Sequence, residues 1–483
     1  MSRLIVGPFN RVEGDLEVKL DIHDDHVSNA TVVTPMYRGF EKILVGKDPR
    51  DALVYAPRIC GICSVSQSTA AALALAELQG VEAPPNGRLA SNIILATENI
   101  ADHITHFYLF FMPDFAREIY SDKSWFEQIA ARFAAVKGAA TTEVLPARAE
   151  FLHIVGILAG KWPHTLAIQP GGTTKTVAPQ EQFRLSAILL KFRKFLEQTM
   201  FGASLEEISA FQSVAALEKW CAEKGPEHSD FCRFVSVSKH LKLAELGRAA
   251  DRFMSYGAYS QETGHLFARG LIGQQGPQQL EPDLISEDVS HAWLAADTKP
   301  RHPYDGVTIP DEEMLNGYTW CKAPRLAGKT MEVGALARQV VDGHPLMRDA
   351  VARSGGNVEN RILARLLETA LLVPEMQKWV GELSPGDPFR VHGKQQTDGK
   401  GLGLIEAARG SLGHWLSVQN ANIANYQIIA PTTWNFSPRD EQGNPGPLEQ
   451  ALVNAPVVKG ETDPVAVQHI VRSFDPCMVC TVH

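Results

Sequence analysis

Two Cys-x-x-Cys pairs lie near opposite ends of this chain, and whether they meet constrains any fold that the chain can adopt. The first pair is Cys60 and Cys63, and the second is Cys477 and Cys480, shortly before the terminal His483. Cysteines three apart on a helix or tight turn point the same way, so each pair can act as a two-thiolate ligand. Apolar neighbours indicate that these sulfurs are buried, and a buried thiolate needs a metal or another cation nearby.

The cysteines alone leave three interpretations open. A structural zinc site usually draws its pairs from within about 20 residues of each other, whereas these pairs are separated by almost the whole chain. A thioredoxin-like redox motif explains one pair only and needs a strand–helix pattern that is missing here. A soft-metal centre shared by the two ends is favoured, with a zinc clip and unrelated thiols as the alternatives.

Composition narrows the classes of function. Lys and Arg total 46 against 55 Asp and Glu, a formal net charge of −9, and without a basic run nucleic-acid binding is not expected. Seven cysteines, four of them in the two pairs, fit a reducing compartment better than a disulfide framework. The sequence has no basic-then-apolar leader and no run of 18 apolar residues, so we expect a cytoplasmic protein without a membrane span.

Hydrophobic periodicity predicts a mainly α protein with peripheral β structure, an α+β fold with a central bundle of long helices. Strands are expected over residues 4–34 and 387–427, and a surface excursion over 272–330. We expect one domain over 1–483, with an N-terminal β region (about 1–46), a helical bundle (about 47–385) and a glycine-rich region with a metal-binding tail (about 386–483). Helices are expected over residues 66–78, 86–112, 125–160, 179–220, 230–271 and 357–383.

Some polar residues stand out from their apolar surroundings. Asp102 and His106 are four apart on the apolar helix expected over 86–112, so they share a face beside His103. A satisfied buried histidine is common, and a functional cluster is the alternative. Glu13 lies in a charged cluster that is either a solvated turn or a carboxylate aimed inward, and Glu41 taken alone would be assigned to the surface.

Taken together, these segments closely resemble the large, catalytic subunit of [NiFe]-hydrogenases over essentially the full length. The match includes both cysteine pairs and the following blocks: residues 11–14 (RVEG), 38–41 (RGFE), 58–63 (RICGIC), 102–108 (DHITHFY), 322–325 (KAPR), 331–334 (MEVG), 409–415 (RGSLGHW), 431–435 (PTTWN) and 475–477 (DPC). The resemblance implies the fold of that subunit and a hydrogenase that cleaves H2 heterolytically.

The resemblance also implies a nickel–iron centre whose iron carries CO and cyanide. Cys60 and Cys477 would be terminal nickel ligands, whereas Cys63 and Cys480 would bridge to iron. Thiolates are soft donors that suit such metals. Cys477 would accept the proton released from H2, and Glu13 would relay it outward.

Further residues are assigned by the same resemblance. Arg409 would hold a fixed positive charge over the metals with Asp102 and Asp475 as its partners, and Thr432 would donate a hydrogen bond to a cyanide. Glu41, the carbonyl of Ile428 and the ring of His483 would bind a Mg²⁺ ion, with Glu332 as an outer contact.

Three features depart from the usual family pattern. Gln67 stands where the family usually has His, and it can hydrogen-bond near the metals but carry no proton. Ile62 and Phe110 are bulkier than the usual residues of the gas channel, so oxygen tolerance is expected. The chain stops at His483, without the C-terminal extension of most members.

These three features favour a regulatory, H2-sensing hydrogenase, with an ordinary uptake or bidirectional enzyme in mature form as the alternative. No further cysteine set could hold an iron–sulfur cluster, so a small iron–sulfur subunit is the expected partner. A sensor would further require a signalling partner, for which a histidine kinase is expected.

Overall fold

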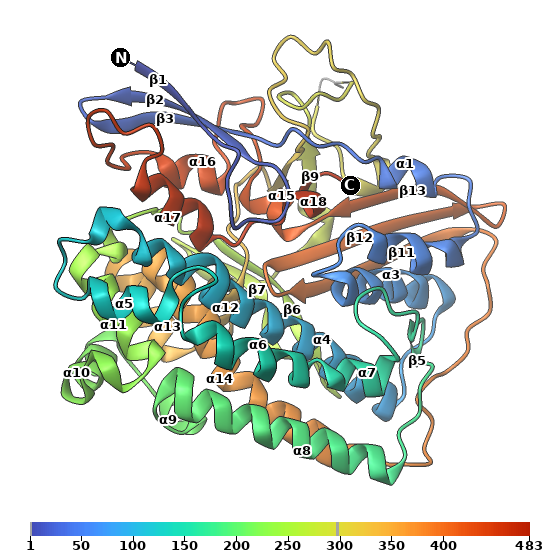
Figure 1. Ribbon diagram of the computed structural model, residues 1–483. Coiled ribbons are helices and arrows are strands. Elements are labelled where there is room, and N and C mark those ends of the chain that lie inside the picture. The colour runs from blue at the N-terminus through green and yellow to red at the C-terminus, as the bar shows by residue number, and fades with distance from the viewer. Residues whose placement is uncertain (1, 296–298) are drawn as a thin grey trace.

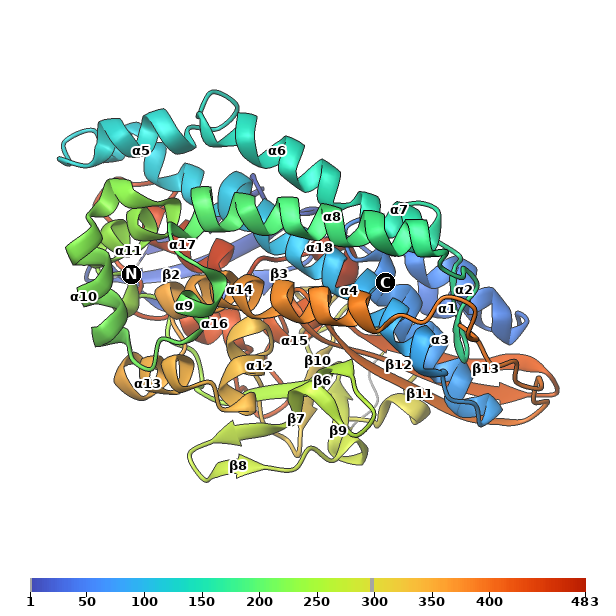
Figure 2. The ribbon, with the colours of Figure 1, turned by 90° about the horizontal axis from the view of Figure 1, so that it is seen from below.

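A computed structural model describes residues 2–295 and 299–483, and two long helices form its centre. They are α4 (Pro85–Thr105) and α14 (Val358–Glu382), which pack against each other, and Figure 2 shows them crossing the molecule together with α8 (Pro179–Phe195). Their contact face is apolar because isoleucine and leucine recur at helical spacing, as Ile93 and Ile100 do in α4.

Both long helices begin and end for local reasons. The side chain of Asn357 accepts a hydrogen bond from the backbone N–H of Asn360 and so caps the start of α14. The α-helical part of α4 ends at Thr105, and the chain continues through a π-helical segment, His106–Phe111, into a 3₁₀ turn that contains Pro113. The helices expected over 86–112 and 357–383 are therefore confirmed.

Shorter helices surround this pair, and the predicted stretches 125–160 and 179–220 are each divided into several of them (Figure 1). The remaining α-helices are α1 (Phe40–Leu44), α2 (Ala52–Tyr55), α3 (Ser64–Gln79), α5 (Phe126–Phe133), α6 (Ala140–Phe151), α7 (His153–Ala159), α9 (Leu205–Ser209), α10 (Val214–Lys224), α11 (Asp230–Leu241), α12 (Ala335–Asp342), α13 (Pro345–Ser354), α15 (Pro431–Asn435), α16 (Pro447–Leu452), α17 (Val465–Ser473) and α18 (Met478–Thr481).

The strands form small antiparallel sheets at the periphery, so the expected α+β class is confirmed. The N-terminal sheet has β1 (Ser2–Val6), β2 (Glu17–His23) and β3 (His26–Val33) in that order, and the glycine-rich sheet has β11 (Gly399–Ala407), β12 (Gly410–Gln419) and β13 (Asn422–Ile429). The other sheets contain β6 (Phe253–Ser260), β7 (His265–Gly273) and β8 (Gly276–Gln278), β9 (Ile285–Asp288) and β10 (Ala323–Leu326), and β4 (Ile168–Gln169) and β5 (Gly172–Thr173).

The helix expected over 230–271 is wrong beyond Leu241, because β6 and β7 occupy half of the rest. All residues of β6 except Ser260 are buried, so the strand shows no alternation of buried and exposed residues, and periodicity does not separate such a strand from a buried helix. The excursion expected over 272–330 also differs, since Glu287, Lys322 and Arg325 are buried within it.

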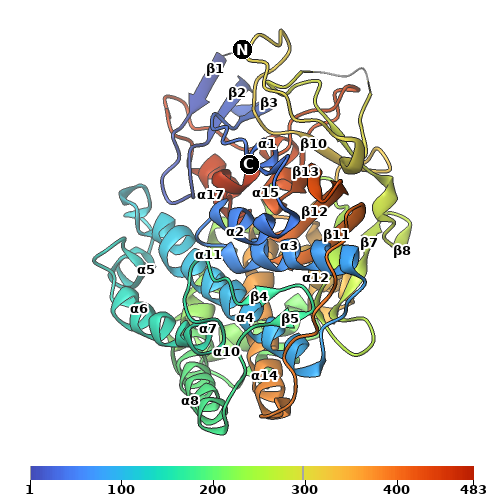
Figure 3. The same cartoon turned by 90° about the vertical axis from the view of Figure 1, so that its right-hand side faces the viewer.

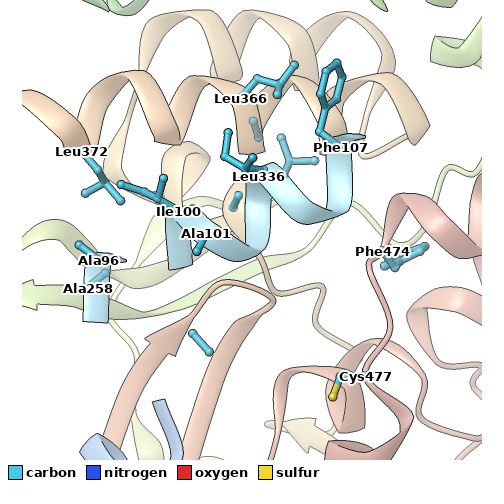
Figure 4. Packing of buried hydrophobic residues seen from close by; sticks show 14 of the residues in the cluster. Ala96, Ile100, Ala101, Phe107, Ala258, Leu336, Leu366, Leu372, Phe474 and Cys477 are labelled. Carbon is cyan, nitrogen blue, oxygen red and sulfur yellow. The ribbon is translucent and has the colours of Figure 1, made fainter. Parts of the chain in front are cut away.

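One hydrophobic core joins residues from both ends of the chain, from Val6 to Cys480. Figure 4 shows part of this core, with side chains of α4, α12 and α14 and the segment that carries Cys477. The C-terminus lies inside the molecule near α1 and β13, where His483 is only 5% exposed (Figure 3). The two ends therefore share a single interior.

Glycines in β11 allow this strand to lie directly on α3. A Cβ atom at Gly401 would lie 2.0 Å from the carbonyl oxygen of Ala74, and one at Gly403 would lie 1.9 Å from that of Ala70. Both distances are far below van der Waals contact, so only glycine fits at these positions. The glycine-rich stretch thus serves helix–sheet packing, and it presses the sheet against the helix that follows Cys63.

We predict that Gly403→Ala destabilises the protein by about 1–3 kcal/mol or more, because the added methyl group forces β11 away from α3. Gly381→Ala is the matched control, since no atom lies within 4 Å of a Cβ at this position in α14 and alanine favours a helix by up to about 1 kcal/mol. Thermal unfolding of both variants checks this. Equal midpoints would contradict the close packing.

Candidate metal centre

Four thiols from the two ends of the chain converge at one point. The Sγ atoms of Cys60, Cys63, Cys477 and Cys480 all lie within 4.8 Å of one another. Cys60 lies 3.5 Å from Cys477, Cys63 lies 3.1 Å from Cys480, and Cys477 lies 3.0 Å from Cys480. The two cysteine pairs are thus interleaved, so that one centre is made from both ends.

Each cysteine pair is placed by backbone contacts with other segments. The Cys477 segment pairs with Glu13 in a parallel β-bridge, in which Met478 N–H donates to the Glu13 carbonyl at 2.7 Å. The guanidinium of Arg38 donates hydrogen bonds to the carbonyls of Ile59 and Val479, at 3.3 Å to the latter. Arg38 therefore ties the first pair to the second.

The donor set fits a soft metal. Three of the four cysteines are buried and Cys63 is half-buried, and burial raises the pKa of the Cys477 thiol. Four thiolates this close would repel one another, so a cation must offset their charge, and four sulfur donors match nickel, iron or zinc. Cys221, Cys232 and Cys321 take no part in this group.

A small cavity adjoins the thiols on one side. Cys63, Cys477 and Cys480 line it, whereas Cys60 does not. The other lining residues come from the segment before α3, from α3, α4, β12, the β11–β12 turn and α15, and they include Ile62, Ser66, Gln67, Glu98, Asn99, Asp102, Ala408, Arg409, Leu412, Pro431 and Thr432. Three of the four sulfurs therefore border an enclosed space with a distinct set of polar groups.

A buried guanidinium with two carboxylates forms the charged wall of this cavity. Arg409 donates through Nε to the carbonyl of Asp475 at 2.8 Å and through Nη2 to its Oδ1 at 3.0 Å, and Nη1 lies 3.1 Å from Asp102 Oδ2. Although burial opposes ionisation, Arg409 lowers the pKa of Asp475 to about 2. Burial raises the pKa of Asp102, with Arg409 opposing this effect. The structure brings all three predicted partners together.

Two further predicted residues point polar groups toward the thiols or the cavity. Thr432 Oγ1 accepts a hydrogen bond from the backbone N–H of Cys477 at 3.1 Å. The Oε1 atom of Gln67 lies 2.8 Å from His414 Nε2, and the Gln67 Nε2 atom is buried with no hydrogen-bond partner among the described residues. An amide donor is therefore available at this cavity.

The two predicted gas-channel residues lie in different places. Ile62 lines the cavity beside Cys63. Phe110 lies half-buried in the π-helical segment His106–Phe111, outside the lining of the cavity. The gas-channel role of Phe110 stays a prediction.

Glu13 is half-buried next to the Cys477 segment and does not line the cavity. Burial raises the pKa of its carboxyl group, the nearby Cys60 thiol adds to this effect, and Arg409 opposes it. A carboxyl group with a raised pKa next to buried sulfur is suited to exchange a proton.

A second polar cluster surrounds His483. Its Nε2 atom lies 2.6 Å from the Ile428 carbonyl oxygen and 3.5 Å from Glu41 Oε1, so the three predicted magnesium ligands are together. The ammonium of Lys322 binds Glu41 at 3.0 Å and lowers the pKa of this carboxyl to about 2 against the effect of burial. Oxygen donors suit Mg²⁺, and the Lys322 ammonium already offsets the negative charge of Glu41 at this site.

Sequence reasoning missed several members of these two sites. Lys322 stands in the quoted block at residues 322–325 but was given no role, and Glu287 joins it at 3.3 Å. Glu98 lines the cavity and was read only as part of a helix. Glu332 pairs with Arg361 at 2.8 Å instead of joining the Glu41 cluster, so its predicted outer contact is wrong.

Comparison with known proteins agrees with this geometry. The family model described as nickel-dependent hydrogenase matches residues 38–135 and 136–483. The chain is 29% identical to the uptake hydrogenase large subunit of Azotobacter chroococcum mcd 1 and 28% identical to the periplasmic [NiFeSe] hydrogenase large subunit of Desulfomicrobium baculatum, covering 100% of this chain and 95% of each relative.

Solved structures show the same fold. The Ni-Fe-Se hydrogenase from D. vulgaris Hildenborough in the reduced state superposes with a TM-score of 0.85 at 29% identity, covering 100% of both chains. The Ni-Fe-Se hydrogenase from Desulfomicrobium baculatum, in a reduced, active form, gives 0.86 at 27% identity and the same coverage. Within the described residues, no helix is long and apolar enough to cross a membrane.

Proposed function

Because this chain belongs to the nickel-dependent hydrogenase family and is the large subunit of a hydrogenase enzyme, we propose that it oxidises H2 at the four-cysteine centre. The convergence of Cys60, Cys63, Cys477 and Cys480 within 4.8 Å carries this proposal. Each turnover converts one H2 into two protons and two electrons, so the protein must conduct both away from a buried site.

The four thiols would hold a nickel–iron pair, with Cys60 and Cys477 on nickel alone and Cys63 and Cys480 shared with iron. This division follows the family resemblance. Both shared sulfurs border the cavity, as Cys477 also does, so the iron's diatomic ligands would have a space beside them. When bound, the metals supply the Lewis acidity that polarises H2 and the redox capacity that takes up its electrons.

The polar groups of the cavity would hold CO and cyanide on the iron. Arg409 is fixed by Asp102 and Asp475, so its positive charge faces the cavity and the side chain need not move when ligands are held there. Thr432 and the free amide of Gln67 are the hydrogen-bond donors available to cyanide nitrogen. The Glu41, Ile428 and His483 cluster would hold Mg²⁺, with Lys322 beside it.

Protons would leave through Glu13, which lies outside the cavity lining. Cys477 Sγ accepts the first proton as the terminal base, and Glu13 receives it, since the two residues are backbone neighbours across the β-bridge. Burial raises the pKa of Glu13, which makes its carboxylate a better acceptor than a surface glutamate.

Electrons would leave through a separate small iron–sulfur subunit. The three remaining cysteines lie apart from the four-thiol group, so the residues that the structure describes offer no second cluster of thiols for iron–sulfur chemistry. The similar proteins include uptake and [NiFeSe] hydrogenases, which favours the uptake alternative over the regulatory sensor. A histidine-kinase partner has no support from them and is not proposed.

The function is tested on the purified large–small heterodimer. We expect nickel and iron to be bound and H2-dependent dye reduction at the median rate of enzymes, on the order of 10 s⁻¹. Turnover below about a hundredth of that rate, with both metals bound, would favour the sensor. A protein that holds only zinc would refute the metal centre.

We predict that Glu13→Gln abolishes H2 oxidation and H/D exchange and leaves metal loading intact, because glutamine keeps the shape of glutamate but carries no proton. Asp15→Asn is the control, since Asp15 is exposed and lies two residues away. Isotope exchange followed by mass spectrometry checks this. Unchanged exchange in Glu13→Gln would remove Glu13 from the proton route.

We further propose that Ile62 narrows gas access to the cavity and hinders O2 more than the smaller H2. Ile62→Val should therefore raise inhibition by O2 several-fold with little change in the KM for H2. The rate of dye reduction at increasing O2 measures this effect. Phe110→Leu is measured in the same way, because Phe110 is the other predicted gas-channel residue and lies outside the cavity lining. Equal O2 inhibition in wild type and Ile62→Val would count against the narrow passage.

A further inference from the structure

Helix α3 begins immediately after Cys63, one of the four cysteines of the metal centre, and its first backbone N–H groups receive no hydrogen bond acceptor from that side chain. Cys63 is the N-cap residue of α3, the position from which a side chain usually accepts hydrogen bonds from the first free N–H groups. The Cys63 thiol lies 3.1 Å from Cys480 Sγ and makes no cap hydrogen bond. The N–H groups of the first turn therefore need another acceptor.

Glu98, which comes from the middle of α4, supplies it. Its Oε2 atom accepts from the backbone N–H of Val65 at 2.8 Å, and its Oε1 atom accepts from that of Ser66 at 2.9 Å. These are the second and third residues of α3, the same N–H groups that an ordinary N-cap side chain would satisfy. The negative carboxylate also lies at the positive end of the α3 dipole.

The same carboxylate binds the loop on the far side of the cysteine segment. Trp162 donates its indole N–H to Glu98 Oε2 at 3.0 Å. Ser64 Oγ lies 3.4 Å from Oε2 and accepts the backbone N–H of His164 at 3.1 Å. Glu98 is only 2% exposed, so these contacts are made in the interior.

Glu98 is also part of the metal cavity. It lines this space together with Cys63, and it lies four residues before Asp102, the partner of Arg409, so both carboxylates project from one face of α4. One helix face thus contacts the cysteine segment and the charged wall of the cavity.

We propose that Glu98 is a positioning residue of the metal centre. It accepts the hydrogen bonds at the N-terminus of α3 that the Cys63 side chain does not accept, and it thereby fixes the position of the Cys63 thiol. This rests on the proposed function in that Cys63 is taken as a metal ligand. Both carboxylate oxygens are needed, because each accepts a hydrogen bond from a backbone N–H group, and an N–H group can only donate. An amide at this position would turn its own N–H₂ toward one of those donors.

The test compares Glu98→Gln with Glu449→Gln in the purified heterodimer. Glu449 is a buried carboxylate that also accepts a backbone N–H, from Val32 at 3.1 Å, but it lies on α16 outside the metal cavity. Burial raises the pKa of both carboxyl groups to about 7, so the control matches in environment as well. The readouts are nickel and iron retained after dialysis against a chelator, the infrared bands of the metal centre, and the thermal midpoint.

We expect both variants to unfold at a lower temperature, but only Glu98→Gln to lose metal affinity, by about 10- to 100-fold, with shifted infrared bands. Wild-type metal retention and bands in Glu98→Gln would overturn the proposal. Loss of metal from Glu449→Gln to the same degree would also overturn it, because a general loss of stability would then explain both.

Glu98→Asp covers the case in which Glu98→Gln does not fold. Aspartate keeps both oxygens but is one methylene shorter, so we expect weaker metal retention than wild type. Wild-type retention and bands in Glu98→Asp, or failure of both variants to fold while Glu449→Gln folds, would assign Glu98 to fold stability alone and overturn the proposal. A wild-type protein without nickel would instead refute the proposed function.

Discussion

The structure depends on offsetting the charge of four thiolates that meet in its interior. Cys60 and Cys63 reach this point from one end of the chain, and Cys477 and Cys480 from the other, so the metal centre joins both ends. As thiolates, the four sulfurs would repel one another unless a cation offset their charge. Arg38, which hydrogen-bonds the backbone of both segments, shows that part of this closure is built into the protein itself.

The helices around the centre are equipped to carry buried charge. Arg409 is held by Asp102 and Asp475, and Arg338 of α12 binds Glu368 of α14 at 2.7 Å and Glu406 of β11 at 2.9 Å. Each guanidinium is paired with two carboxylates, which is the arrangement that makes burial of an ion tolerable. The Arg338 network connects α12, α14 and β11, and α4 joins it through His103, whose Nε2 atom lies 3.1 Å from Glu368 Oε1.

The proposed chemistry divides the centre into two sides. Glu13 lies beside Cys477 through a backbone bridge and offers protons a way out, whereas Arg409 and Thr432 face an enclosed space suited to small ligands. The helix-capping role of Glu98 belongs to the same scheme. The Cys63 thiol makes no cap hydrogen bond to α3, and the cap comes from a neighbouring helix.

The sequence by itself determined the features that are local or carried by motifs: the long helices α4 and α14, the N-terminal and glycine-rich strands, and the cysteine pairs. Only the tertiary structure decided the rest. Strand β6 is buried on both faces, so its apolar run carries no period that separates strand from helix. Glu98 and Lys322 act on partners tens to hundreds of residues away, and neither sequence spacing nor residue type indicates which distant groups a buried charge will meet.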